Sequence, residues 1–132
     1  MKRVLLDTSA YSSLFRGDER MKRTLQEVEE TALTPVILGE LLAGFTGGRF
    51  EARNRELLKE FLETPRVRVY PIDGETSERY AAVWLHLREQ GTPIPTNDLW
   101  IAASAMQHGL TVLTADRHFL KVPQVLTRII GD

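Results

Sequence analysis

Val4-Leu5-Leu6-Asp7-Thr8-Ser9 is the stretch that decides how the rest of the chain is interpreted. Its three consecutive apolar residues are typical of a short strand buried on both faces. An acid and two hydroxyl residues follow at once, and the pattern over residues 8–15 predicts a short helix. A buried strand that ends in a carboxylate and leads into a helix indicates an α/β protein with a polar site at the strand's carboxyl end.

The same alternation of strands and helices continues to the end of the chain. Short apolar runs predict further strands, and apolar residues at helical spacing predict helices between them. This order favours an α/β fold with a mostly parallel sheet of four or five strands, covered by helices on both faces. A length of 132 residues suits one domain, residues 1–132. The predicted strands are 32–34, 67–70, 110–113 and 125–130, and the predicted helices are 18–30, 36–45, 50–62, 75–90 and 98–108.

The composition excludes several classes of protein. The chain has no cysteine, which rules out a disulfide scaffold, a thiolate zinc site and a cysteine nucleophile, and which fits a cytoplasmic location. The apolar run at the start is too short for a secretory signal, and no apolar stretch approaches the roughly 20 residues that cross a bilayer. We therefore expect no membrane association. The net charge of −1 argues weakly against a general nucleic-acid binder.

Four carboxylates stand out because their neighbours in the sequence are apolar. Asp7 ends the first strand, and Asp116 follows the strand predicted at 110–113. Glu40 is the only ionisable residue in its helix, and Asp98 begins another apolar helix. An isolated ionised carboxylate is costly to bury unless it is paired or binds a cation. Because ends of parallel strands and starts of the following helices share one edge of the sheet, we expect these four to converge.

A divalent cation would explain such a cluster. Four like charges in one crevice raise one another's pKa values, and a hard cation relieves this repulsion. Oxygen-only ligands suit Mg²⁺ or Mn²⁺. Setting the four acids aside leaves 14 acidic against 17 basic residues, and a mildly basic shell suits a phosphodiester substrate. Arg16, shortly after the first strand, is the preferred candidate for contact with a substrate phosphate.

Four segments of the chain carry these acids. They are Leu5-Leu6-Asp7-Thr8-Ser9, Glu40 in its apolar helix, Asn97-Asp98-Leu99-Trp100-Ile101-Ala102-Ala103 and Leu113-Thr114-Ala115-Asp116-Arg117-His118-Phe119. Together they resemble the signature segments of the PIN-domain nucleases, and in size and motif they are most similar to VapC-type toxins. The resemblance implies a three-layer αβα fold and a Mg²⁺- or Mn²⁺-dependent endoribonuclease that leaves 5′-phosphate and 3′-hydroxyl ends. It also implies a homodimer, an RNA substrate such as tRNA or rRNA, and a small antitoxin partner that enters the active-site groove.

The resemblance also implies roles for individual residues. Asp7 and Asp98 would be direct metal ligands, and Asp116 would bind the metal directly or through water. Glu40 would hold a water molecule on the metal or help to activate the nucleophile. Supporting hydroxyl groups are expected from Thr8, Ser9 and Thr114.

Simpler interpretations of these residues remain open from the sequence. Asp7 and Asp98 both precede helices and could serve only as N-caps. Glu40 could be an exposed helix position, and Asp116 could be a turn residue.

One histidine and the two tryptophans are expected to have structural roles. His118 is expected to pack the loop after Asp116 rather than to catalyse. Trp84 and Trp100 are expected in the core or at an interface rather than as platforms for nucleobases.

Other functions were weighed against the nuclease. An aspartate-nucleophile phosphatase needs a second acid two residues after Asp7, and Ser9 stands there. A phospho-accepting receiver domain needs adjacent early acids, which this chain lacks. Two alternatives stay open: a PIN nuclease for RNA processing, and a PIN module that binds RNA or protein with little catalysis.

Overall fold

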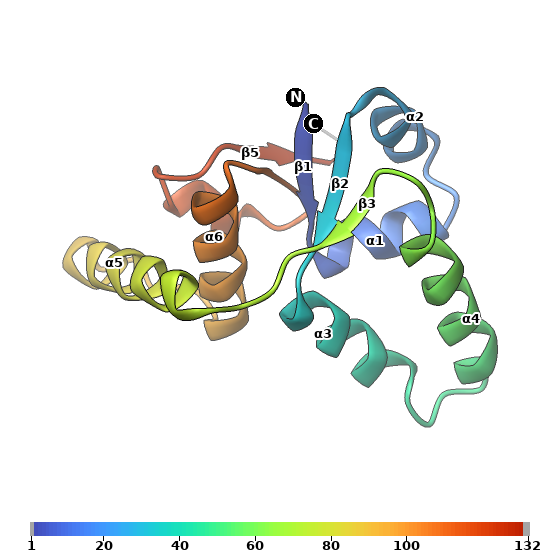
Figure 1. The fold of residues 1–132 in the computed structure, drawn as a ribbon. Helices are drawn as coiled ribbons and strands as arrows, with labels where there is room; N and C mark the ends of the chain where they lie inside the picture. The colour runs from blue at the N-terminus through green and yellow to red at the C-terminus, as the bar shows by residue number, and fades with distance from the viewer. Residues whose placement is uncertain (1, 131–132) are drawn as a thin grey trace.

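The computed structural model describes residues 2–130, and its strands form one five-stranded sheet (Figure 1). The strand order is β3-β2-β1-β4-β5, and every neighbouring pair is parallel. β1 therefore lies in the middle of the sheet, between two strands that come from distant parts of the chain. The strands are β1 (Arg3–Leu6), β2 (Glu30–Leu33), β3 (Val67–Val69), β4 (Thr111–Thr114) and β5 (Thr127–Ile129).

Helices flank the sheet on both sides. Figure 1 shows α5 and α6 on one side of β1 and β2, with α1, α2 and α4 on the other and α3 below the strands' carboxyl ends. The helices are α1 (Thr8–Phe15), α2 (Glu19–Glu27), α3 (Pro35–Phe45), α4 (Glu51–Leu62), α5 (Gly74–Gln90), α6 (Thr96–His108) and the short 3-10 helix η1 (Arg117–Lys121).

The alternation of side chains along β1 divides the core into two layers. Leu5 belongs to one apolar cluster, together with Val83 of α5 and Ile101 of α6. Val4 and Leu6 belong to the other cluster, which includes residues of α1 and α2. Val4, Leu5 and Leu6 are fully buried, as expected for a central parallel strand. The predicted three-layer α/β fold is therefore confirmed, with five strands.

The helix predicted over residues 18–30 is too long. It ends at Glu27; Val28 is buried but extended, and β2 begins at Glu30. Parallel pairing decides this boundary, because Glu30 lies opposite Arg3 in the ladder and accepts a hydrogen bond from the Arg3 guanidinium at 3.0 Å. The second strand ends at Leu33, one residue earlier than predicted, and Thr34 followed by Pro35 begins α3 as N-cap and first helical residue, as the sequence also predicts.

The start of α6 also differs from the prediction. The helix begins at Thr96, with Pro95 before it, so Asp98 lies within the first turn and not at the N-cap. Gly109 ends the helix in the left-handed conformation, with φ of 64°, as expected for a glycine after a helix. η1 was not predicted. Among residues 2–130, none of the helices combines the length and the apolar composition that a bilayer crossing demands.

Candidate active site

A pocket of about 410 Å³ opens at the carboxyl edge of the sheet, and all four isolated carboxylates line it. β1 and β4 are neighbours in the sheet, so the residues that follow these strands lie side by side. The starts of α1 and α6 and the middle of α3 complete the walls. We call this the acidic pocket; it is lined by Asp7, Thr8, Ser9, Ser12, Arg16, Glu40, Asp98, Ile101, Ala115 and Asp116.

Asp7 is 5% exposed and is held by three hydrogen bonds. Its Oδ1 accepts from the Ser9 hydroxyl at 2.7 Å and from the Ala10 backbone N–H at 2.9 Å, and its Oδ2 accepts from the Thr114 hydroxyl. Burial raises the pKa of Asp7; the hydrogen bonds oppose this rise, and the charge of Asp116 adds to it. Asp7 therefore caps α1 and lines the acidic pocket at the same time, so the two interpretations of this residue are compatible.

Two hydroxyl groups tie the end of β1 to the end of β4. Thr114 is fully buried, and its Oγ1 accepts a hydrogen bond from the backbone N–H of Asp116 at 2.8 Å. The Ser9 hydroxyl oxygen accepts from the backbone N–H of Ala115 at 2.9 Å. These bonds fix the backbone that carries Asp116 relative to Asp7.

Glu40 joins three helices at the pocket wall. Its Oε1 accepts from the Thr8 hydroxyl at 2.8 Å, and its Oε2 accepts from the Asn97 side-chain amide at 3.3 Å. α1, α3 and α6 each supply one of these residues. Both carboxylate oxygens are thereby oriented, although the side chain is only half-buried.

Asp98, Asp116 and His118 form the tightest group of possible metal ligands among residues 2–130, with one ligand atom from each within 4.8 Å of the others. His118 Nδ1 lies 3.1 Å from Asp98 Oδ2 and 3.0 Å from Asp116 Oδ2. Burial raises the pKa of Asp98, and the hydrogen bond with His118 partly offsets this rise. Asp7 and Glu40 lie outside this group of three.

The sequence interpretation missed the contacts of His118. Phe119 is buried in the core, but the histidine beside it turns toward the two acids. The sequence did offer one signal for this contact, because His118 comes only two residues after Asp116. In the structure, Asp116 Oδ1 accepts a hydrogen bond from the His118 backbone N–H at 2.8 Å.

The sequence model of the PIN domain matches residues 4–125 of this chain. The chain belongs to the PIN-domain family.

Individual relatives agree with this assignment. The chain is 31% identical to Ribonuclease VapC4 of Mycobacterium tuberculosis, over 95% of each chain. It is 30% identical to Toxin FitB of Neisseria gonorrhoeae, over 86% of this chain and 87% of that protein. Among solved structures, FitAcB of the same bacterium matches with a TM-score of 0.75 and 29% identity, over 94% of this chain and 95% of that one. VapBC2 of Rickettsia felis, bound to promoter DNA, matches with a TM-score of 0.85, over 96% of this chain and 97% of that one. Because the two sequences are only 21% identical, this match supports the fold alone.

Arg16 lies at the mouth of this PIN domain's acidic pocket. It follows α1 directly, is exposed, and is the one arginine or lysine that lines the pocket within residues 2–130. A cation beside a group of carboxylates is well placed to attract a substrate phosphate that the acids alone would repel.

Proposed function

We propose that this PIN domain, residues 1–132, is a Mg²⁺- or Mn²⁺-dependent endoribonuclease that hydrolyses RNA phosphodiester bonds in the cytoplasm. The observation that carries the proposal is the acidic pocket, in which Asp7, Glu40, Asp98 and Asp116 come together from four separate segments. Relatives about 30% identical over most of their length are named ribonucleases, which supports RNA as the substrate.

The residues of the pocket fit a hard divalent cation. Asp98, Asp116 and His118 offer three ligand atoms close together, and Asp7 adds a carboxylate on the same wall. A donor set dominated by carboxylate oxygens suits Mg²⁺ or Mn²⁺, and Mn²⁺ also accepts imidazole. When bound, such an ion would offset negative charge on a phosphate and lower the pKa of water in the pocket. It would also favour the ionised forms of Asp7 and Asp98, whose pKa values burial raises.

The other residues would position the reactants. Arg16 would contact the phosphate, and Thr114 and Ser9 would keep Asp7 in its orientation. Glu40, oriented by its two hydrogen bonds, would accept the proton of the attacking water. The water oxygen forms a bond to phosphorus as the bond from phosphorus to the 3′-oxygen breaks. That oxygen takes a proton from solvent, which leaves 5′-phosphate and 3′-hydroxyl ends.

A cleavage assay tests the proposal. Structured RNA is incubated with the purified protein in Mg²⁺, Mn²⁺ or EDTA, and the products are separated on a denaturing gel. We expect cleavage with either metal, none in EDTA, and a loss of at least 100-fold in Asp98→Asn, as expected when a metal ligand is removed. Glu56→Gln is the matched control, because Glu56 is an exposed acid of α4 outside the acidic pocket. Equal cleavage in EDTA, or by Asp98→Asn, would refute the metal role.

We further propose that the chain is the toxin of a toxin–antitoxin pair and forms a homodimer. Similar solved structures include FitAB of Neisseria gonorrhoeae and VapBC-5, a toxin–antitoxin system of Mycobacterium tuberculosis, which supports a protein partner. An apolar hollow of about 220 Å³ adjoins the acidic pocket and shares Ser12 and Arg16 with it. An apolar segment of an antitoxin bound there would lie beside the catalytic acids. Its apolar lining is Tyr11, Phe15, Phe45 and Leu57.

The partner is tested by co-expressing the chain with the product of the adjacent small reading frame. We expect the two proteins to purify together and the complex to cleave RNA more slowly than the free chain. Phe15→Ser, which changes a side chain 41% exposed in the hollow, should weaken the complex. Full cleavage by a stable complex would rule out inhibition by that partner.

A further inference from the structure

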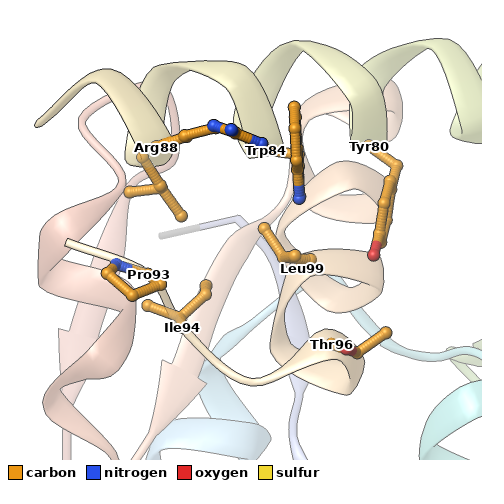
Figure 2. Close-up of a pocket in the computed structure, with 8 residues that line it drawn as sticks. Tyr80, Trp84, Arg88, Pro93, Ile94, Thr96 and Leu99 are labelled. Atoms are coloured by element: carbon orange, nitrogen blue, oxygen red, sulfur yellow. The ribbon is translucent and has the colours of Figure 1, made fainter. Parts of the chain in front are cut away.

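A second pocket, of about 460 Å³, lies between α5 and the loop that leads into α6. Figure 2 shows Tyr80, Trp84 and Arg88 along α5, with Pro93 and Ile94 of the loop facing them. Trp84 is 44% exposed, which is unusual for so large an apolar side chain. We call this the Trp84 pocket; it is lined by Tyr80, Trp84, Leu87, Arg88, Pro93, Ile94, Thr96 and Leu99.

The side chains of the Trp84 pocket combine an aromatic ring, a cation and apolar walls. The Arg88 guanidinium lies 5.1 Å from the centre of the Trp84 ring. Arg88 forms no ion pair with any residue from 2 to 130, so its charge is available to a ligand. A half-exposed tryptophan beside an arginine suits a nucleotide, because a base can stack on either side chain and a phosphate can pair with the guanidinium.

Three other residues of the pocket lining are held in place by packing against the rest of the protein. Tyr80 packs against Trp100 of α6, with ring centres 4.3 Å apart. Leu87 and Leu99 are both buried. The pocket is therefore built on two packed helices, and its volume lies in the range typical of pockets for small organic ligands.

The start of α6 connects the Trp84 pocket to the acidic pocket. Thr96 and Leu99 line the first, whereas Asp98 and Ile101 line the second. Between them, Asn97 donates a hydrogen bond to Glu40 at the wall of the acidic pocket. A single turn of helix thus separates the two pockets. An RNA strand with one phosphate among the acids would therefore run close to the Trp84 pocket.

We propose that the Trp84 pocket binds an unpaired nucleobase of the RNA substrate, with the base stacked on Trp84 and its phosphate paired with Arg88. The proposal rests on the ribonuclease function proposed above and extends it to substrate recognition. It also revises the expectation that Trp84 serves only the core or an interface. A site of this kind selects single-stranded loops, because a paired base is not available for stacking on a side chain.

A binding measurement without catalysis tests the subsite. The probe is a fluorescent RNA hairpin with a randomised eight-nucleotide loop, and its Kd is measured by anisotropy in EDTA, where no metal-dependent cleavage occurs. We expect Trp84→Ala to raise the Kd roughly 5- to 150-fold, the range found for stacked bases, and Trp84→Phe to restore most of the affinity. Arg88→Gln should weaken binding and reduce its dependence on salt. Leu85→Ala is the matched control, because Leu85 is 50% exposed on α5 but does not line the pocket.

Each alternative outcome is decisive. Unchanged hairpin affinity in both Trp84→Ala and Arg88→Gln, with a wild-type protein that binds and cleaves RNA, overturns the subsite and leaves the ribonuclease standing. If Trp84→Ala instead turns a dimer into a monomer during sedimentation, with unchanged RNA affinity, the surface joins two copies of the chain and the proposal is wrong. A wild-type protein that neither binds nor cleaves RNA overturns both proposals. A blunt RNA duplex should bind more weakly, without any effect of Trp84→Ala.

Discussion

Replacing Thr114 by valine would remove one hydroxyl from the wall of the acidic pocket while keeping the side chain's shape. Thr114 is fully buried; it donates to Asp7 and accepts from the backbone N–H of Asp116. A hydrogen bond to a charged group contributes about 1.5–3 kcal/mol and a neutral one about 1 kcal/mol. We therefore expect Thr114→Val to lower the free energy of unfolding by about 3 kcal/mol at pH 7.

The expected loss depends on pH through Asp7. The bond from Thr114 lowers the pKa of Asp7 against the effect of burial, so the variant's folded-state pKa rises further above 3.8. When the pKa of an acid is higher in the folded than in the unfolded state, the folded state is destabilised at pH values above the folded-state pKa. At pH values below the unfolded-state pKa, stability is unchanged. The destabilisation should therefore shrink as the pH falls from 7 toward 4.

Urea unfolding in EDTA, followed by circular dichroism at both pH values, measures this effect. Thr34→Val is the matched control, because Thr34 is also fully buried, directly after β2, but its hydroxyl has no hydrogen-bond partner among residues 2–130. Removing an unpaired buried hydroxyl should stabilise the protein by about 1 kcal/mol. A loss below 0.5 kcal/mol in Thr114→Val, where about 3 is expected, or the same loss at both pH values, would refute the reasoning.

Three further variants test other parts of the structure. Asp98→Asn should melt up to about 4 °C higher in EDTA at pH 7 and gain less near pH 4, because burial raises the pKa of Asp98 and its ionised form costs stability only at the higher pH; a clear fall in melting temperature would contradict this. His118→Ala should weaken Mn²⁺ binding 10- to 100-fold by calorimetry if the ring is a ligand or orients one, and an unchanged Kd would return His118 to a packing role. Gly109→Ala should destabilise the protein by about 1 kcal/mol, because φ is 64° there, whereas Gly44→Ala inside α3 should stabilise it by a similar amount; thermal melts that rank them in the opposite order would disprove the backbone argument.

The sequence predicted the fold well wherever a local pattern and the sheet agreed. Asp7 and Asp116 could be placed together because each follows an apolar run, and parallel strands bring their carboxyl ends to one edge. The spacing of apolar residues predicted the wrong backbone conformation at Val28, which is buried and continues the helical spacing of α2. Its backbone is nevertheless extended, because β2 must pair with β1. Nothing local distinguishes these two ways of burying the same side chain.

Features that depend on the direction of a side chain could not be predicted from the sequence. His118 reaches Asp98 only because a short 3-10 helix turns the chain after Asp116. The Trp84 pocket depends on how far α5 stands from the loop before α6, and helical periodicity assigns Trp84 to the same face as its buried neighbour Leu87. The four acids were recognisable by their isolation, and the hydroxyl residues Thr8, Ser9 and Thr114 by their place in the motifs. Only the structure shows which acid each hydroxyl contacts.

The central place of β1 has a consequence for synthesis of the protein on the ribosome. Asp7 is made before the Thr114 hydroxyl that orients it, which lies 107 residues later, on the strand that completes the site. At roughly 5–20 residues per second, about 5–20 seconds of translation separate the two. A nascent chain therefore lacks a complete acidic pocket until β4 and Asp116 have been made, and the activity proposed for this chain would begin only after that.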